Sequence, residues 1–202
     1  MIKVGITGGI GSGKTTVCME WEKLGARVLY ADPLAKELMV SDDKVRSQLI
    51  QAFGDQTYRP GGKLNKSYLT KEAFKKGRVQ ELNAIVHPRV YEVTKERMRQ
   101  AEKEGCEVFV YEAALLLQHG RPDHIDLVML VLADQQKRVQ RVVERDQSDE
   151  EAVWSRIEKQ QDFEQLKTLS DYVIENNGSL GELINQAREL FDVIKSRVAE
   201  FD

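Results

Sequence analysis

The residues Gly8–Thr15 have types and spacing suited to holding phosphate groups. They read Gly-Gly-Ile-Gly-Ser-Gly-Lys-Thr, follow the apolar run Ile2–Ile6 and precede a helix-compatible stretch. In such a loop the glycines let backbone N–H groups turn inward, Lys14 reaches the outer phosphates, and the Thr15 hydroxyl can ligate Mg²⁺. The helix that starts here adds the positive end of its dipole. The pattern predicts a triphosphate site; the alternative is a glycine-rich turn without a ligand.

Two carboxylates stand where predicted strands end. Asp32 follows the run Arg27–Ala31, and Glu112 closes the run Glu107–Tyr111. In an open α/β sheet the carboxyl ends of the strands face the ligand crevice. Asp32 can therefore orient or deprotonate an acceptor hydroxyl, or it can cap a helix that begins at Pro33. Glu112 can hold the metal through water, or it can be an exposed residue at a strand end.

Four arginines form a candidate clamp for a transferring phosphoryl group. Arg138, Arg141 and Arg145 are spaced i, i+3, i+7 on one helical face, and Arg156 follows a break at 146–148. The alternative is a solvated face neutralised by the acidic residues nearby. At least one functional arginine is expected, and Arg145 is the first choice because it is nearest the break.

Further candidates are less specific. Asn176 and Asn177 follow the last predicted strand and can meet a nucleotide base, or they can form a plain turn before the capping box Ser179-x-x-Glu182. His87, which precedes Pro88, can contact a substrate or lie in a rigid loop.

The elements that must position these residues alternate between strands and helices. The five runs expected to form buried parallel strands are Ile2–Ile6, Arg27–Ala31, Glu107–Tyr111, Leu127–Leu132 and Tyr172–Glu175. They predict an α/β fold with a doubly wound sheet.

Two polar, helix-rich segments interrupt the predicted strands. The segment 33–105 is far longer than one crossover helix requires and predicts a helical insertion. The segment 135–169 predicts two helices, Gln135–Arg145 and Glu150–Leu169, and Ser148 with Glu151 forms a capping box for the second. This segment is expected to act as a lid on a single unit spanning 1–202.

Composition bounds the function. The chain has 202 residues, a formal net charge of −3 and 31% charged residues, which favours a soluble globular protein with no general attraction to nucleic acid or anionic membranes. No run of about eighteen apolar residues and no leader pattern occurs, so a cytoplasmic protein is expected. Cys18 and Cys106 fit no zinc or disulfide pattern and are expected to be buried. The sequence does not predict the oligomeric state.

Several motifs together resemble the dephospho-coenzyme A kinase family, within the nucleoside monophosphate kinase class. Glu112 is followed by Ala-Ala-Leu rather than by the motif of a GTP switch. The segments that carry the resemblance are Gly5–Val17, Ala31-Asp32, Leu82–Pro88, Arg145-Asp146 and Asp171–Gly178. Two departures are Tyr30, where the family often has Asp, and Gln118, where it has Glu.

The resemblance implies MgATP as phosphate donor and the ribose 3′-hydroxyl of dephospho-coenzyme A as acceptor. It implies that Asp32 is the base or orienting group, that the insertion 33–105 holds the acceptor and that the lid arginines clamp the transferring group; His87 is the candidate contact to the acceptor within the insertion. The loop residues expected to bind ATP are Gly11, Ser12, Gly13, Lys14, Thr15 and Thr16, with Lys14 also catalytic. A nucleoside or nucleotide kinase and a nucleotide-gated regulatory module are the alternatives.

Overall fold

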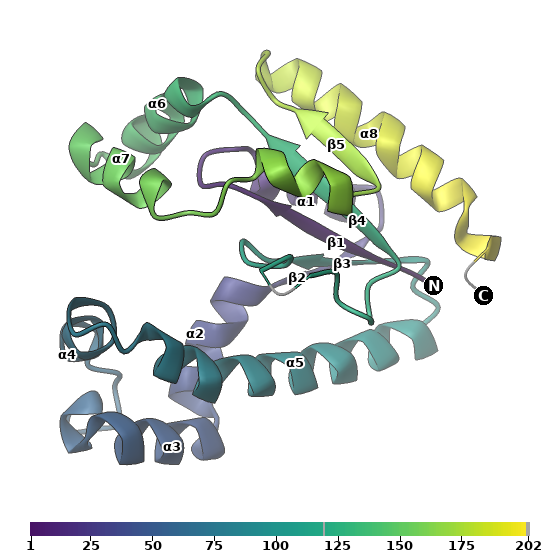
Figure 1. Ribbon diagram of the computed structural model, residues 1–202. Coiled ribbons are helices and arrows are strands. Elements are labelled where there is room, and N and C mark those ends of the chain that lie inside the picture. The colour runs from purple at the N-terminus through teal and green to yellow at the C-terminus, as the bar shows by residue number, and fades with distance from the viewer. Residues whose placement is uncertain (119, 201–202) are drawn as a thin grey trace. The chain divides into compact units, whose positions relative to one another are not determined.

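The computed structural model describes residues 1–118 and 120–200 (Figure 1). The chain forms two compact units. The first comprises residues 1–29 and the chain from Ala101 onward, and the second comprises residues 30–100. The first unit carries the sheet and the phosphate loop, and the second is helical.

A five-stranded sheet forms the centre of the first unit. Its strands are β1 (Ile2–Gly8), β2 (Arg27–Tyr30), β3 (Val108–Glu112), β4 (Leu127–Leu132) and β5 (Tyr172–Glu175). The order is β2-β3-β1-β4-β5, and β1 pairs in parallel with both β3 and β4. Nearly all residues of β1, β3 and β4 are buried, as expected for parallel strands covered on both faces. The predicted α/β class and all five strands are confirmed.

The strand ends differ slightly from the predicted ones. β1 continues to Gly8 because Gly8 still pairs with Val131 of β4. β3 includes Glu112, which lies opposite Ile6 in the parallel register. Ala31 belongs to a helix rather than to β2. The extra pairing brings the phosphate loop and Glu112 to the same edge of the sheet.

Two helices of the first unit pack together through aromatic side chains. They are α1 (Lys14–Lys23) and α8 (Leu180–Ser196). The Trp21 indole N–H donates to the Ala187 carbonyl at 2.7 Å, and its ring meets Phe191 edge to face at 5.4 Å. The Ser179–Glu182 capping box starts α8 as predicted. These contacts hold the helix that follows the phosphate loop.

The predicted lid forms α6 (Gln135–Asp146) and α7 (Glu150–Glu158), which lie side by side (Figure 1). The predicted capping box at Ser148 is wrong. Asp149 caps α7 instead, because its carboxylate is one residue nearer the helix and accepts from the Ala152 N–H at 3.1 Å. The second helix also ends at Glu158 rather than at Leu169, and a 3₁₀ helix covers Glu164–Leu169.

The second unit contains α2 (Ala31–Ser41), α3 (Asp43–Phe53), α4 (Lys66–Thr70) and most of α5 (Val79–Lys103), with a 3₁₀ turn at Asp55–Thr57 and a π-helical turn at Lys71–Lys75. A salt bridge of 2.7 Å joins Arg89 of α5 to Asp42 before α3. His87 and Pro88 lie inside α5, so the rigid-loop interpretation is wrong. Pro88 removes only one backbone N–H from a long helix.

Two features considered from the composition are the absence of long apolar runs and the burial of the two cysteines. In the parts of the chain that the structure describes, no helix is long and apolar enough to cross a membrane. Cys18 is buried as predicted, and burial raises the pKa of its thiol far above the ordinary range. Cys106, which was also expected to be buried, is only partly buried and lies between the turn at 104–105 and β3.

Candidate active site

The phosphate loop joins β1 to α1 in a conformation that requires glycine. Gly11 and Gly13 have φ angles of 75° and 106°, which lie in the left-handed region. A Cβ at Gly13 would also lie only 2.4 Å from the Asn176 amide nitrogen. The α-helix begins at Lys14, immediately after Gly13. The first N–H groups of α1 and the positive end of its dipole therefore face the loop.

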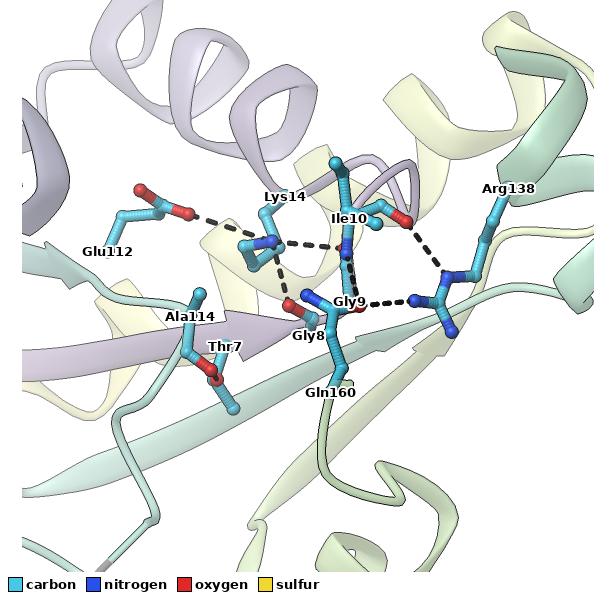
Figure 2. A network of polar contacts seen from close by, with 9 residues as sticks. All are labelled: Thr7, Gly8, Gly9, Ile10, Lys14, Glu112, Ala114, Arg138 and Gln160. Carbon is cyan, nitrogen blue, oxygen red and sulfur yellow. Dashed lines mark hydrogen bonds and ion pairs between the residues drawn. The ribbon is translucent and has the colours of Figure 1, made fainter. Parts of the chain in front are cut away.

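Lys14 lies within the loop and faces a buried carboxylate (Figure 2). Its Nζ donates to the carbonyl oxygens of Gly8 at 2.8 Å and Gly9 at 3.1 Å, and lies 3.8 Å from Glu112 Oε1. Glu112 is only 8% exposed, so its interpretation as an exposed strand-end residue is wrong. The parallel pairing of β1 with β3 brings the two side chains together.

Arg138 of α6 makes a contact with the loop that the sequence did not predict. Its Nε donates to the Ile10 carbonyl at 2.8 Å, and its Nη2 donates to Gln160 Oε1 at 2.6 Å. The same Gln160 oxygen accepts from the Ile10 N–H at 3.1 Å. Figure 2 shows the side chains of Arg138 and Gln160 meeting the loop at the backbone of Ile10.

Asn176 holds the other side of the loop. Its amide donates to the Ser12 carbonyl at 2.8 Å, and Arg141 donates to the Asn176 carbonyl at 3.1 Å. Asn177 accepts from the Asp134 N–H at 2.8 Å and from the Lys137 ammonium. The Asn-Asn pair thus links β5, α6 and the loop, which a plain turn would not do.

The arginine stripe divides into two groups. Arg138 donates to the loop at Ile10, and Arg141 donates to Asn176 beside the loop. Arg145 instead forms two hydrogen bonds with Asp146, at 2.7 and 3.0 Å. Arg156 lies 3.7 Å from the same carboxylate. The hydrogen bond to Asp146 raises the pKa of Arg145. Neutralisation by a neighbouring acid, one of the two predicted possibilities, therefore applies to Arg145 and Arg156 in this conformation.

Asp32 and His87 belong to the second unit. Asp32 is exposed in the first turn of α2, two residues after β2 ends. The interpretation of Asp32 as a helix cap is wrong. The helix α2 begins at Ala31, one residue before Asp32, and Tyr30 occupies the cap position. His87 is exposed on α5.

The loop residues suit a magnesium-bound triphosphate. Thr15 is exposed at the second position of α1, and Glu112 supplies a carboxylate at the end of β3. The buried Ser12 hydroxyl has no hydrogen-bond partner among the described residues. Hydroxyl and carboxylate oxygens are ligands that Mg²⁺ accepts, and this ion usually takes only one or two of them from protein. Thr15 and Glu112 would hold the ion, which would neutralise phosphate charge.

A cavity of about 370 Å³ opens beside Asn177 at the carboxyl ends of β4 and β5. Its walls include Asp134, Arg138, Phe163 and Glu175, so it offers an aromatic face together with hydrogen-bond acceptors. Such a lining suits a planar ring that carries amino groups.

The parallel sheet and the loop between β1 and α1 define a phosphate-loop nucleotide-binding protein of the α/β class. A family model described as dephospho-CoA kinase matches residues 2–182. The chain belongs to the dephospho-CoA kinase family.

Named relatives match nearly the whole chain. The dephospho-CoA kinase of Salinibacter ruber is 41% identical over 95% of this chain and 96% of its own length. That of Thermobifida fusca is 37% identical over 98% of each chain. The crystal structure of a Thermus thermophilus protein has a TM-score of 0.78 at 30% identity, covering 95% of this chain and 96% of that one. The dephospho-CoA kinase from Campylobacter jejuni shares the fold, with a TM-score of 0.64 at 21% identity and coverage of 95% and 96%.

Proposed function

We propose that this chain transfers the γ-phosphoryl group of MgATP to the ribose 3′-hydroxyl of dephospho-CoA, giving coenzyme A and ADP. The proposal rests on the phosphate loop, where the Lys14 ammonium lies 3.8 Å from the Glu112 carboxylate. The chain that carries this loop matches the dephospho-CoA kinase family over residues 2–182.

The loop residues Gly11–Thr16 hold the phosphates of ATP in this proposal. Backbone N–H groups and the Lys14 ammonium supply positive charge, and Thr15 with Glu112 holds Mg²⁺. Lys14 exchanges its contacts with the Gly8 and Gly9 carbonyls for phosphate oxygens. Asn176 and Asn177 bind the nucleotide, and the adjacent cavity accepts its base.

Asp32 acts on the acceptor. Its carboxylate orients the 3′-hydroxyl and takes its proton as the new O–P bond forms and the bond between the γ-phosphorus and the β,γ-bridging oxygen breaks. The insertion 33–105 holds dephospho-CoA, and His87 contacts it. The leaving electron pair stays on ADP, so no other reagent is needed.

The lid 135–169 closes over the donor and excludes water. Arg145 leaves Asp146 and contacts the transferring group, whose equatorial oxygens carry charge in a loose transition state. Exclusion of water prevents transfer of the phosphoryl group to the solvent.

The test is ADP release from MgATP with and without dephospho-CoA, beside adenosine, AMP, CMP and uridine as rival acceptors. Strong stimulation by dephospho-CoA alone is the expected result. Stimulation by a nucleoside or nucleotide instead would assign another kinase reaction, and slow ATP loss that no acceptor stimulates would favour a nucleotide-gated regulatory module.

A further inference from the structure

The second unit carries a segment, residues 44–78, whose charge is opposite to that of the rest of the chain. It holds nine lysines and arginines but only Asp55 and Glu72 as acidic residues, which gives it a formal charge of +7. The remaining residues hold 21 basic and 31 acidic side chains, a formal charge of −10. The whole-chain value of −3 therefore conceals a positive region with a field of its own.

Internal contacts account for only part of this positive charge. Lys76 lies 2.8 Å from Glu72, and Arg78 forms salt bridges with Glu72 and Glu81. Arg46 donates to backbone carbonyl oxygens. The other six cations of the segment are exposed and form no salt bridge within residues 1–118 and 120–200: Lys44, Arg59, Lys63, Lys66, Lys71 and Lys75.

Two of these lysines share a turn with an exposed aromatic ring. The π-helical turn Lys71–Lys75 follows α4 (Figure 1), and its first and last residues are about one turn apart, so they lie on one face. Phe74, the residue before Lys75, is 62% exposed. Phenylalanine is usually buried, and π-helical turns occur frequently at functional sites.

A ring beside two ammonium groups fits a ligand that has both an aromatic base and phosphate groups. Lysine attracts phosphate oxygens as a compact charge, and aromatic side chains stack on bases. In the proposed reaction ATP uses the phosphate loop of the first unit, where Lys14 supplies the charge. The acceptor, which carries an adenine and an anionic diphosphate, is the ligand assigned to the second unit.

We propose that Lys71, Phe74 and Lys75 form a nucleotide-binding surface for dephospho-CoA, on which the two ammonium groups attract the diphosphate and the Phe74 ring stacks on the adenine. This inference rests on the proposed function, in which the insertion 33–105 holds the acceptor. These contacts lie away from the transferred group and are the same before and during transfer. Their loss therefore raises the KM for dephospho-CoA with little change in kcat.

The first test measures the KM for dephospho-CoA as a function of ionic strength, at saturating MgATP, for the variant Lys71→Gln/Lys75→Gln and for the unaltered chain. Attraction between exposed charges fades between about 0.01 and 1 M salt, because the Debye length falls from about 30 to about 3 Å. The KM of the variant should be about threefold or more above that of the unaltered chain at the lowest ionic strength. The two KM values should converge at the highest.

The matched control is Lys23→Gln/Lys195→Gln, which removes the same charge from exposed positions on α1 and α8 of the first unit. Its KM for dephospho-CoA should stay within about twofold of the original at every ionic strength, because these charges are on other elements. Equal rises for the two double variants would make net charge alone responsible and would overturn the inference. A rise for Lys71→Gln/Lys75→Gln that persists at high salt would assign the lysines to the fold and would also overturn it.

The second test is Phe74→Leu, which keeps an apolar side chain and a good helix former. Without a ring to stack on adenine, the KM for dephospho-CoA should rise about fivefold or more, on the order expected for one stacked base, at low and high ionic strength alike. The KM for MgATP should stay within about twofold, since the donor binds to the first unit. An unchanged KM for dephospho-CoA would overturn the inference even beside a lysine effect, because charge alone does not make a nucleotide-binding surface.

The two proposals fail separately. If the unaltered chain shows no ADP release stimulated by dephospho-CoA, the proposed function is wrong. If it shows that activity and the Lys71, Phe74 and Lys75 variants have the KM of the control, only the role of this surface is wrong.

Discussion

Lys14 Nζ lies 3.8 Å from Glu112 Oε1, across the pairing of β1 with β3. Because the strands are parallel and in register, the phosphate loop and an acidic side chain from a distant part of the sequence meet at one edge of the sheet. Glu112 keeps the ammonium at the loop, and a carboxylate in this place can also accept a hydrogen bond from a metal-bound water.

Replacing Lys14 by Ala should reduce kcat/KM about a thousandfold, which corresponds to several kcal/mol of transition-state stabilisation. In the proposed mechanism the Lys14 ammonium supplies positive charge to the outer phosphates of ATP. Steady-state kinetics with MgATP and dephospho-CoA measure the effect. Lys23→Ala, at the end of the same helix, is the control and should change the rate little. A loss below tenfold for Lys14→Ala would contradict its catalytic role.

Glu112→Gln separates two roles of the carboxylate. If Glu112 holds Mg²⁺ through water, the variant should need a higher concentration of Mg²⁺ for half-maximal activity at a fixed, saturating concentration of ATP. If Glu112 only positions Lys14, kcat falls but the Mg²⁺ dependence does not move. Titration of activity with Mg²⁺ decides between these results, and the first is expected.

Asp32→Asn should lower turnover strongly and leave the affinity for ATP within about twofold, because the amide cannot accept the proton. The control is Asp43→Asn, since Asp43 is an exposed aspartate in the first turn of the neighbouring helix α3. Single-turnover rates and ATP titrations give the two quantities. A kinetically silent Asp32→Asn would remove this residue from the mechanism.

Gly13→Ala and Gly25→Ala form a pair with the same backbone strain. Their φ angles are 106° and 101°. A Cβ at position 13 would meet Asn176, whereas a Cβ at position 25 would meet no atom of the described residues within 4 Å. Both variants should lose about 1–3 kcal/mol of stability from the left-handed conformation. Only Gly13→Ala should also weaken ATP binding, because the loop must move away from Asn176. Thermal unfolding with and without ATP distinguishes them, and equal ATP-induced shifts in Tm would contradict the expectation.

Glu20 should contribute to acid unfolding. Hydrogen bonds to Lys23 and then Arg188, at 2.9 and 2.7–2.8 Å, lower its pKa below the ordinary 4.5. A carboxyl whose folded pKa is depressed stabilises the protein above its unfolded pKa. That stability is lost as pH falls through the unfolded value toward the folded one. Denaturant titrations between about pH 6 and 3 should show a shallower decline for Glu20→Gln than for the unaltered chain; parallel curves would contradict this role.

The fold was predictable wherever a single local sequence pattern determines the element. Short apolar runs indicated every strand, and the glycine pattern placed the loop between β1 and α1. The ends of elements were less predictable because competing caps lie close together. Ser148 and Asp149 both fit the start of α7, and only the folded chain shows that the carboxylate of Asp149 is used.

The site was predictable in its residue types but not in its long-range contacts. The i, i+3, i+7 spacing showed that Arg138, Arg141 and Arg145 share a helical face, but not that their partners would differ. Arg138 meets Gln160, which lies beyond α7, because Val139 and Val142 of α6 pack in one apolar cluster with α7. Spacing along one helix carries no information on such packing.

The pair between Arg145 and Asp146 is exposed, and its two side chains are adjacent in sequence. Surface ion pairs of this kind contribute about 0–1 kcal/mol, which is close to thermal energy. In the proposed mechanism the guanidinium therefore loses little free energy when it leaves Asp146 for a phosphate oxygen. If Arg145 acts as proposed, the pair with Asp146 keeps the guanidinium ordered between catalytic cycles at little cost to its transfer.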